Sequence, residues 1–325
     1  MDPQIKVAVL MGGIGSERQV SLLSGVNIAR ALAEAGFDVV TSDITPDSLG
    51  ILDDERIDLF FLALHGQFGE DGRLQQILES RGLAYTGSDA RASRLAFDKA
   101  ASKAAFRDAG IIVAPDVTVT AEADLTDLPA RLTKFGDKFV VKPIREGSSV
   151  GVVIVEGPDN ARDAARRCLQ DFGDCMIEAF VPGRELTVGI VDGRALPIIE
   201  IKSKMAFYDY QAKYLDDATE YLFDTVGNAE TAGRVQETAV ACFEALGCRH
   251  LGRVDMILAD DDVAYVLEIN TLPGFTSHSL LPMAAARAGL PADALCGEIA
   301  RSALRDIRGC GSEHSLRRGG NADKD

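Results

Sequence analysis

Two apolar segments near the C-terminus carry three side chains whose oxygen atoms could hold a divalent cation. Residues 254–259 and 263–269 flank an acidic turn, a pattern that predicts an antiparallel hairpin. Asp255 lies near the start of the first predicted strand, while Glu268 and Asn270 project from one face of the second. Hard cations such as Mg²⁺ prefer oxygen ligands and keep places for water and phosphate. The hairpin is therefore a candidate metal site, with ordinary solvated acids at a strand end as the alternative.

Polar groups beside this hairpin could act on a phosphate or on a carbonyl whose oxygen becomes negatively charged. Arg253 lies two residues before Asp255, and a guanidinium can bind phosphate or carboxylate through two parallel hydrogen bonds. Pro273 and Gly274 predict a turn whose backbone N–H can face a developing oxyanion. Residues 276–279 are typical of a helix start, where free N–H groups favour a carboxylate.

Length, charge and cysteine use limit the class of protein. The chain has 325 residues with 46% hydrophobic content, enough for two or three domains that each bury a core. Its net charge of −16 argues against nucleic acid or an anionic membrane as the main partner and favours a small substrate. No apolar run approaches about 18 residues and the N-terminus does not resemble a signal peptide, so we expect a soluble, cytoplasmic protein. The spacing of the six cysteines and four histidines suggests reduced thiols and no zinc site.

The N-terminal third predicts a small parallel sheet with helices. A strand at 5–11 leads through a glycine loop into a helix from about 17 to 35, and Ser16 with Gln19 fits a capping box at the helix start. The loop lacks both the Gly-x-Gly-x-x-Gly and the Gly-Lys-Ser/Thr patterns, so a dinucleotide or P-loop interpretation is weak. Glu17 either favours the helix dipole or faces a ligand from a loop between a strand and a helix.

Two further polar residues follow predicted elements of this region. A strand at 59–64 ends at His65, the usual binding edge of a parallel sheet, although a structural histidine is a fair alternative. A helix at 98–108 contains Lys99, which alone would be an ordinary solvated lysine.

A glycine- and serine-rich loop, 145–151, joins two predicted strands at 139–143 and 152–155. Such a loop can close over phosphates, and strand alternation can turn Lys142 away from the core. The loop also matches Gly-x-Ser-x-Gly, which raises the alternative of a serine hydrolase with Ser149 as nucleophile. A nucleophile elbow needs a helix after its turn, whereas a β-type run follows here.

The next segments suggest a nucleotide contact and a lid. A strand at 176–181 leads into a turn, where the backbone of 179–181 could bind an adenine edge while Glu185 accepts from ribose hydroxyls. An ordinary strand end and turn are the alternative. The polar, aromatic stretch 207–214 suits a long mobile loop, and the tail from Gly309 is predicted to be disordered.

Taken together, these motifs closely resemble those of the D-alanine–D-alanine ligase family, in the same order from about residue 5 to 307. The motifs are Gly12-Gly13 with Ser16-Glu17-Arg18, Leu64-His65-Gly66, Lys142-Pro143 with 145–151, 207–214, 252–255, and 267–270 through Ser279-Leu280. The resemblance implies an α/β ATP-grasp fold: an N-terminal parallel-sheet domain, followed by central and C-terminal domains that clamp ATP. The expected boundaries are 1–96, 97–183 and 184–308, with a disordered tail at 309–325.

The resemblance also implies chemistry and partners. ATP would convert one D-alanine into an acyl phosphate, which the amine of a second D-alanine attacks, giving D-alanyl-D-alanine for peptidoglycan. The implied cofactors are ATP and two Mg²⁺ or Mn²⁺ ions, held by Asp255, Glu268 and Asn270, and we expect a homodimer. The residues implied to contact ATP are Lys99, Lys142 and Lys213 at the phosphates, and Glu178, Ala179, Val181 and Glu185 at the nucleoside. Those implied for the first D-alanine are Glu17, Ser148, Tyr214 and His65, and those for the second are Ser279 and Leu280. Arg253 and Gly274 would stabilise the oxyanion.

Three positions bear on the details. Ala179 stands where the family commonly has lysine, which leaves only backbone contacts to adenine, and Gln19 replaces a usual glutamate. Lys213 with Tyr214 favours a dipeptide product, because ester-forming relatives lack this pairing. D-serine or D-lactate as second substrate, and a nucleotide-binding protein that has lost catalysis, stay open as alternatives.

Overall fold

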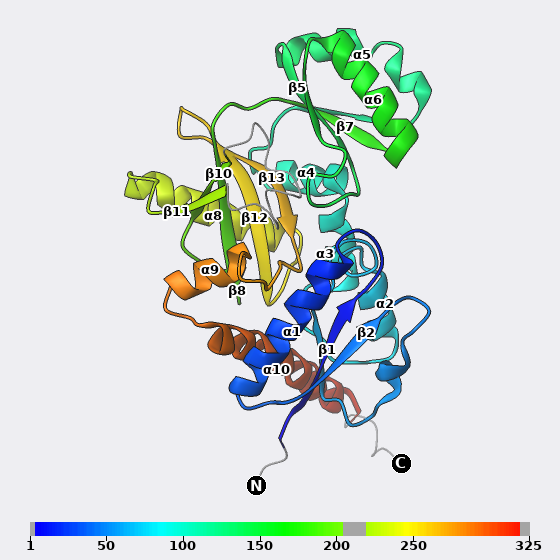
Figure 1. Ribbon diagram of the computed structural model, residues 1–325, viewed down its shortest axis with the longest axis vertical. Coiled ribbons are helices and arrows are strands. Elements are labelled where there is room, and N and C mark those ends of the chain that lie inside the picture. Colours follow the sequence, from blue (N-terminus) through cyan, green and yellow to red (C-terminus); the bar gives the residue numbers. More distant parts are fainter. Residues whose placement is uncertain (1–3, 204–218, 319–325) are drawn as a thin grey trace, which may run out of the picture.

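The computed structural model describes residues 4–203 and 219–318, and within these ranges the strands form three sheets. Figure 1 shows the sheet formed by residues 116–179 as a separate lobe at one end of the molecule. The N-terminal sheet and the C-terminal sheet lie together in the rest of the body. This α/β arrangement agrees with the fold class expected from the sequence, while the domain boundaries stay a prediction.

The N-terminal sheet is parallel, with strand order β2-β1-β3. Its strands are β1 (Lys6–Gly12), β2 (Asp38–Ile44) and β3 (Leu59–Leu62). The accompanying helices are α1 (Arg18–Glu34), α2 (Arg73–Ser80) and α3 (Ala90–Phe97), with a 3-10 turn at Gly50–Asp53. Because parallel strands end at one edge, the segments after β1 and β3 meet there, and these segments carry Glu17 and His65.

The central sheet is antiparallel, with strand order β4-β7-β5-β6. Its strands are β4 (Asp116–Val119), β5 (Lys138–Pro143), β6 (Val153–Glu156) and β7 (Cys175–Ala179). The helices α5 (Leu128–Leu132) and α6 (Pro158–Phe172) pack on one face around a common apolar cluster, beside 3-10 turns at Glu122–Leu125 and Thr133–Phe135. The loop 145–151 joins two antiparallel strands, so Ser149 does not lie on the strand-turn-helix elbow that a serine hydrolase requires.

The C-terminal sheet follows the order β11-β10-β8-β12-β13, with β9 paired to β8. Its strands are β8 (Arg184–Val191), β9 (Arg194–Ala195), β10 (Ile199–Ser203), β11 (Thr219–Phe223), β12 (Leu251–Leu258) and β13 (Ala264–Asn270). The helices α4 (Lys99–Asp108) and α8 (Ala229–Ala245) pack near one another against this sheet. β12 and β13 form the predicted antiparallel hairpin, with a register shift between Asp255 and Met256.

One apolar cluster joins the N-terminal and C-terminal sheets through three helices, α1, α9 (Leu280–Arg287) and α10 (Ala292–Arg318). Figure 1 shows α10 running beside α1. This shared core fixes the edge that carries Glu17 relative to the β12–β13 hairpin. α10 also continues past Gly309, where the sequence predicted the tail to begin, because extending a helix already formed costs less than nucleating one.

One detail of the α1 start was wrong in the sequence analysis. The residue before the helix is Glu17, and no side chain caps the first turn, so Ser16 and Gln19 do not form the predicted capping box. The Glu17 carboxylate is instead engaged with the loop 145–151 of the central sheet. A contact over such a sequence distance cannot be read from the local pattern that defines a cap.

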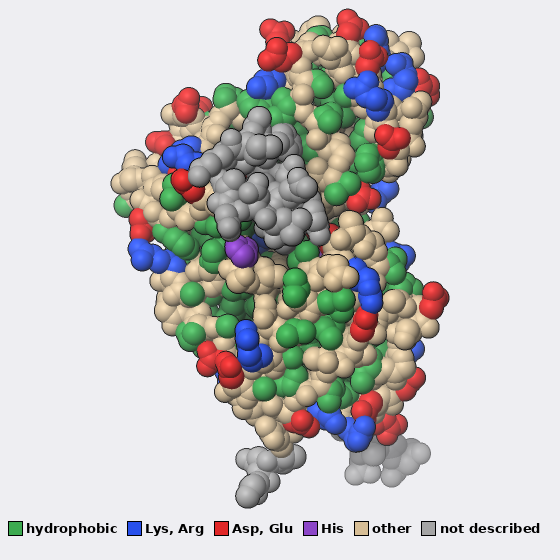
Figure 2. Space-filling view, in the orientation of Figure 1, with side chains coloured by type: hydrophobic (Ala, Val, Ile, Leu, Met, Phe, Trp, Pro, Cys, Tyr) green, Lys and Arg blue, Asp and Glu red, His purple; other side chains and the backbone are tan. Residues whose placement is uncertain are grey.

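The described part of the chain contains no helix that is both long and apolar enough to span a membrane. Acidic and basic side chains are interspersed over the face shown in Figure 2.

Candidate active site

The hairpin of β12 and β13 gathers the three candidate metal ligands around Asp255. Asp255 lies opposite Glu268 in the strand register, and Asn270 donates its amide hydrogen to Asp255 Oδ2 over 3.0 Å. Arg253 donates to both carboxylate oxygens of Asp255, over 2.9 and 2.7 Å, and the Thr187 hydroxyl adds a bond of 2.6 Å. The Asp255 carboxylate is therefore held rigidly, although it is buried, by one guanidinium and two neutral donors.

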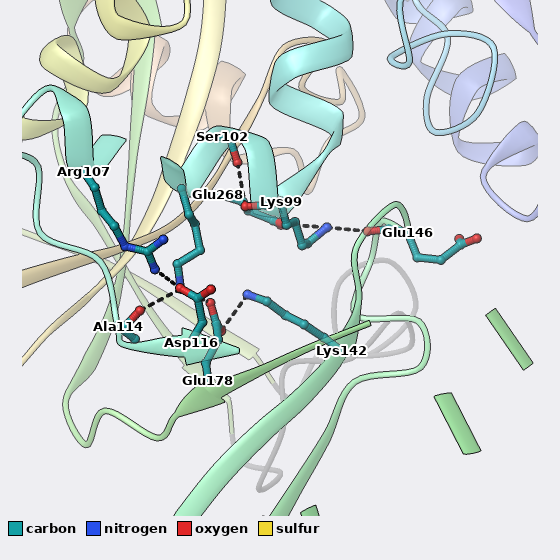
Figure 3. A network of polar contacts seen from close by, with 10 residues as sticks. Lys99, Ser102, Arg107, Ala114, Asp116, Lys142, Glu146, Glu178 and Glu268 are labelled. Carbon is teal, nitrogen blue, oxygen red and sulfur yellow. Dashed lines mark hydrogen bonds and ion pairs between the residues drawn. The ribbon is translucent and has the colours of Figure 1, made fainter. Parts of the chain in front are cut away.

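Lys99 connects the hairpin to the glycine-rich loop. Its ammonium lies 3.1 Å from Glu268 Oε2 and donates to the carbonyl of Glu146 over 2.5 Å. Figure 3 shows Lys99 between these two groups. Lys99 is buried rather than solvated, which favours a role in ligand binding over that of an ordinary solvated lysine.

The donor set of the hairpin suits a hard divalent cation. Two carboxylates and an amide supply oxygen atoms and leave coordination places for water and phosphate. Within residues 4–203 and 219–318, no three histidine, cysteine, aspartate or glutamate side chains are placed to hold one metal ion together, and the hairpin set contains only two acids. In this structure Arg253 and Lys99 neutralise the two carboxylates.

A cavity of about 470 Å³ lies between the central and C-terminal sheets, beside this hairpin. Apolar side chains of both sheets line it, among them Val140, Ile154 and Leu267. Charged side chains also line it, among them Lys142 and Glu185. An apolar cavity with a few placed polar groups is the usual form of a cofactor site. Glu178 and residues 179–181 also line this cavity, and their contact with a nucleoside stays a prediction.

Glu178 is a buried carboxylate held by two lysines. Its Oε2 lies 2.7 Å from the ammonium of Lys142, and its Oε1 contacts the ammonium of Lys103. Burial by itself would raise the pKa of Glu178, but the charges of the two lysines outweigh burial and lower it. Glu178 is therefore ionised and offers only acceptor oxygens to a ligand.

A smaller cavity, of about 50 Å³, adjoins the first and is lined by Glu17, Ser148 and Arg253. The Ser148 hydroxyl donates to Glu17 Oε1 over 2.5 Å. Gly66 and Gly147 surround the same carboxylate, and a Cβ atom at either position would lie 2.6 and 3.1 Å, respectively, from Glu17 Oε2. Both glycines therefore permit the close approach of backbone to this acid.

His65 supports the segment that follows β13. Its Nδ1 lies 3.0 Å from the carbonyl of Leu272, which can only accept, so Nδ1 carries the hydrogen. Its Nε2 then accepts from the Ser24 hydroxyl over 3.1 Å, and Ser24 in turn accepts from the Phe275 N–H. Burial lowers the pKa of His65, which keeps the ring neutral. The chain of bonds fixes the backbone on both sides of Gly274.

Glu70 also lines the smaller cavity and was not among the residues predicted from the sequence. Its carboxylate accepts from the Gly66 N–H over 2.7 Å and from the Leu272 N–H over 3.3 Å. Burial first, and the charge of Glu17 second, raise the pKa of Glu70 to about 8. The sequence did carry one signal for Glu70: it is an acid in the loop that follows a parallel strand, five residues beyond His65.

The candidate residues for a substrate carboxylate lie at the start of α9. The Ser279 hydroxyl accepts from the Thr276 N–H over 2.8 Å, and Leu280 begins the helix, where backbone N–H groups lack intrahelical acceptors. A Cβ at Gly274 would lie 2.8 Å from Ser279 Oγ. The predicted lid at 207–214, including Lys213 and Tyr214, lies outside the described residues.

The fold and the two adjoining cavities define a ligand site between sheets, in which a nucleotide-sized cavity meets a small acidic one at Asp255. Comparison with known proteins narrows this class. The family model for the D-ala D-ala ligase C-terminus matches residues 105–300, and that for the D-ala D-ala ligase N-terminus matches residues 48–88.

Whole-chain likenesses agree with these matches. The D-alanine–D-alanine ligase of Methylacidiphilum infernorum is 42% identical over 90% of this chain and 93% of its own length. The crystal structure of the D-alanine–D-alanine ligase from Bacillus anthracis complexed with ATP superposes with a TM-score of 0.83 at 35% identity, covering 94% of this chain and all of that one. The crystal structure of the VanG D-Ala:D-Ser ligase from Enterococcus faecalis superposes with a TM-score of 0.81 at 26% identity, covering 92% of this chain and 99% of that one. The chain belongs to the D-alanine–D-alanine ligase family and has its ATP-grasp fold.

Proposed function

We propose that this protein joins two D-alanine molecules to D-alanyl-D-alanine for peptidoglycan synthesis, with cleavage of ATP to ADP and phosphate. Membership of the ligase family carries this assignment. The contact between Ser148 and Glu17 supports it, because a small acidic cavity lies at that contact, directly beside the larger cavity.

The larger cavity would hold ATP. Glu178 and the backbone of Ala179 and Val181 would bind the adenine edge, and Glu185 would accept from the ribose hydroxyls. Lys99, Lys142 and Lys213 would contact phosphate oxygens. The apolar side chains and the buried cations Lys99 and Lys142 that line the cavity support this assignment.

The hairpin would hold two Mg²⁺ or Mn²⁺ ions through Asp255, Glu268 and Asn270. When bound, these ions would neutralise phosphate oxygens and so ease phosphoryl transfer. Arg253 and Lys99 hold the two carboxylates in place and would turn part of their charge toward the phosphates.

The first D-alanine would lie in the smaller cavity with its ammonium on Glu17. Ser148 orients that carboxylate, and Tyr214 would support the same group. A carboxylate oxygen of this D-alanine attacks the γ-phosphorus of ATP, the bond to ADP breaks, and an acyl phosphate forms. Positioning and charge neutralisation supply the rate of such a step.

The second D-alanine would place its carboxylate on Ser279 and on the Leu280 N–H. Its free amine attacks the acyl phosphate carbonyl and loses a proton, and phosphate then leaves. Arg253 and the Gly274 N–H would stabilise the tetrahedral oxyanion, and the bonds of His65 and Ser24 hold the backbone beside Gly274. His65 would therefore act by supporting the site.

The experiment is ADP release from purified protein with ATP, Mg²⁺ and D-alanine, with product identification by mass. L-alanine and omission of substrate are the controls, and D-serine and D-lactate test the second-substrate alternative that the VanG likeness raises. We expect D-alanyl-D-alanine as the main product, lost in Glu268→Ala and Arg253→Ala. ATP binding without turnover on any of these substrates would contradict the proposal. We place the enzyme in the cytoplasm, as a homodimer, on the same family resemblance.

A further inference from the structure

Lys103 is a fully buried lysine that the reaction scheme above does not use. It lies on α4, one turn beyond Lys99, with no solvent-exposed surface. Its ammonium donates to the Ala114 carbonyl over 3.0 Å, contacts Glu178 Oε1, and lies 3.4 Å from Asp116 Oδ1. A buried ammonium is costly unless it is paired, so this arrangement is a built charge network rather than an accident of packing.

The network divides the two oxygens of Glu178 between two lysines. Lys103 contacts Oε1, while Lys142 lies 2.7 Å from Oε2. Figure 3 shows Lys142 extending to Glu178 from β5. Both Lys142 and Glu178 line the larger cavity, whereas Lys103 stands behind Glu178 and does not line it. Oε2 is therefore the oxygen that becomes available when Lys142 turns to another anion.

The charges around Lys103 leave one positive charge for a ligand. Lys103, Lys142 and Arg107 contact two carboxylates, Glu178 and Asp116. With Lys103 in place, Lys142 can leave Glu178 for a phosphate without stranding a buried carboxylate. Without Lys103, Lys142 would be the one cation still contacting Glu178 among the described side chains. Lys142 would then stay paired with Glu178 and would not be available to a phosphate.

We propose that Lys103 is a positioning residue for nucleotide recognition, which holds Glu178 ionised with Oε2 toward the cavity and so releases Lys142 to phosphate. This inference rests on the proposed ATP site. It also assigns a source of base selectivity. The edge of adenine presents an amino donor, which an ionised carboxylate accepts, whereas guanine presents a carbonyl oxygen there, which the carboxylate repels.

The test compares Lys103→Met with Lys103→Arg, which keeps a cation that can contact Glu178. We measure the KM and calorimetric Kd of ATP, the KM of D-alanine, and the ratio of kcat/KM for ATP over GTP. Lys103→Met should raise the KM of ATP about tenfold or more, corresponding to loss of one charged hydrogen bond. The D-alanine KM should stay within about twofold, since Lys103 does not reach the smaller cavity. The ATP/GTP ratio should fall, and Lys103→Arg should restore part of each change.

Two further variants separate this role from general stability. Arg107→Met removes the cation on the outer side of Asp116, where it is half-exposed, and should leave the ATP/GTP ratio unchanged. The second is the double variant Lys103→Met with Glu178→Gln. Because it leaves no buried carboxylate without its lysine, it should fold even if Lys103→Met alone does not. This double variant should recover phosphate affinity, measured with ADP, but should not recover base selectivity.

The outcomes distinguish this inference from the proposed site. If Lys142→Met weakens ATP binding while Lys103→Met changes neither the ATP KM nor the base ratio, Lys103 is structural only and the inference is overturned. Equal changes in the ATP and D-alanine KM values would overturn it as well. If Lys142→Met and Glu178→Ala both leave ATP binding unchanged, the nucleotide site itself is wrong.

Discussion

The Ser148 hydroxyl donates a hydrogen bond of 2.5 Å to Glu17, which joins two residues 131 positions apart. Ser148 lies in the loop between β5 and β6, and Glu17 immediately precedes α1 of the N-terminal unit. The contact therefore links the loop over the larger cavity to the acid of the smaller one. Closure of that loop over ATP and correct placement of the first D-alanine would depend on the same bond.

Ser148→Ala should weaken binding of the first D-alanine. Loss of a hydrogen bond to a charged group costs about 1.5–3 kcal/mol, so kcat/KM for D-alanine should fall by roughly 10- to 150-fold. Steady-state kinetics at saturating ATP measure the change, and Ser149→Ala in the same loop is the matched control. An unchanged D-alanine KM in Ser148→Ala would show that the contact does not orient Glu17.

Arg253→Lys should lower kcat more than it changes substrate affinity. A lysine keeps one positive charge but cannot donate to both oxygens of Asp255 while facing an oxyanion. Loss of one oxyanion donor costs about 10²–10³ in kcat. Single-turnover kinetics with saturating substrates provide the measurement, with thermal melting as the folding control. A wild-type rate in a folded Arg253→Lys protein would remove Arg253 from the mechanism.

Stability should decline in mildly acidic solution because of His250. This buried ring accepts from the Gly87 N–H over 3.0 Å and contacts Asp306 over 2.9 Å. Burial first, and Arg249 second, lower the pKa of His250, so below about pH 6.5 the unfolded chain binds a proton that the folded chain resists. The free energy of unfolding therefore falls with pH from about 6.5 down to the folded pKa, by up to about 1.4 kcal/mol per pH unit for each such histidine.

His250→Asn is the comparison for that prediction, since asparagine tolerates the positive φ of 65° at this position. Urea unfolding between pH 5 and about 7.5 should give a shallower pH dependence in the variant than in the wild type. His65 and Glu70 titrate in both proteins, so the difference between the two curves isolates His250. Parallel curves would mean that His250 keeps its ordinary pKa.

Nucleotide affinity should fall in alkaline solution through Lys103. Burial is the largest cause that lowers the pKa of Lys103, and the charges of Lys142 and Arg107 lower it as well, while Glu178 opposes the change; the resulting pKa is about 8. Asp116 lies within ion-pair distance of the same ammonium. As Lys103 loses its proton, Lys142 is drawn to Glu178, so kcat/KM for ATP should decline above about pH 8. Arginine does not titrate there, and the decline should therefore be absent from Lys103→Arg. Identical profiles would contradict this assignment.

The sequence was most informative where local pattern and chemistry coincide. The β12–β13 hairpin was predicted because two apolar runs flank an acidic turn, and alternation alone placed Glu268 beside Asn270 on one face. The expected edge of the parallel sheet similarly brought Glu17 and His65 into one cavity.

Contacts between distant segments could not be predicted in this way. The capping box at Ser16 was wrong: Glu17, not Ser16, immediately precedes the helix, and no side chain caps it. Glu17 instead binds Ser148 in the loop between β5 and β6, and local spacing carries no record of that partner. Glu70 and Lys103 were missed for a related reason. Their character comes from burial and from neighbours brought together by the fold, whereas in the sequence they are an acid in a loop and a lysine on a helix.

The transfer of oxygen from substrate to phosphate tests the central claim most directly. D-alanine labelled with ¹⁸O in its carboxylate is incubated with ATP, Mg²⁺ and the purified protein, and phosphate and dipeptide are analysed by mass. An acyl phosphate intermediate requires that each phosphate released carry one labelled oxygen. ADP should be the nucleotide product, and ADP, phosphate and D-alanyl-D-alanine should form in equal amounts. Unlabelled phosphate, or AMP with pyrophosphate, would contradict the account.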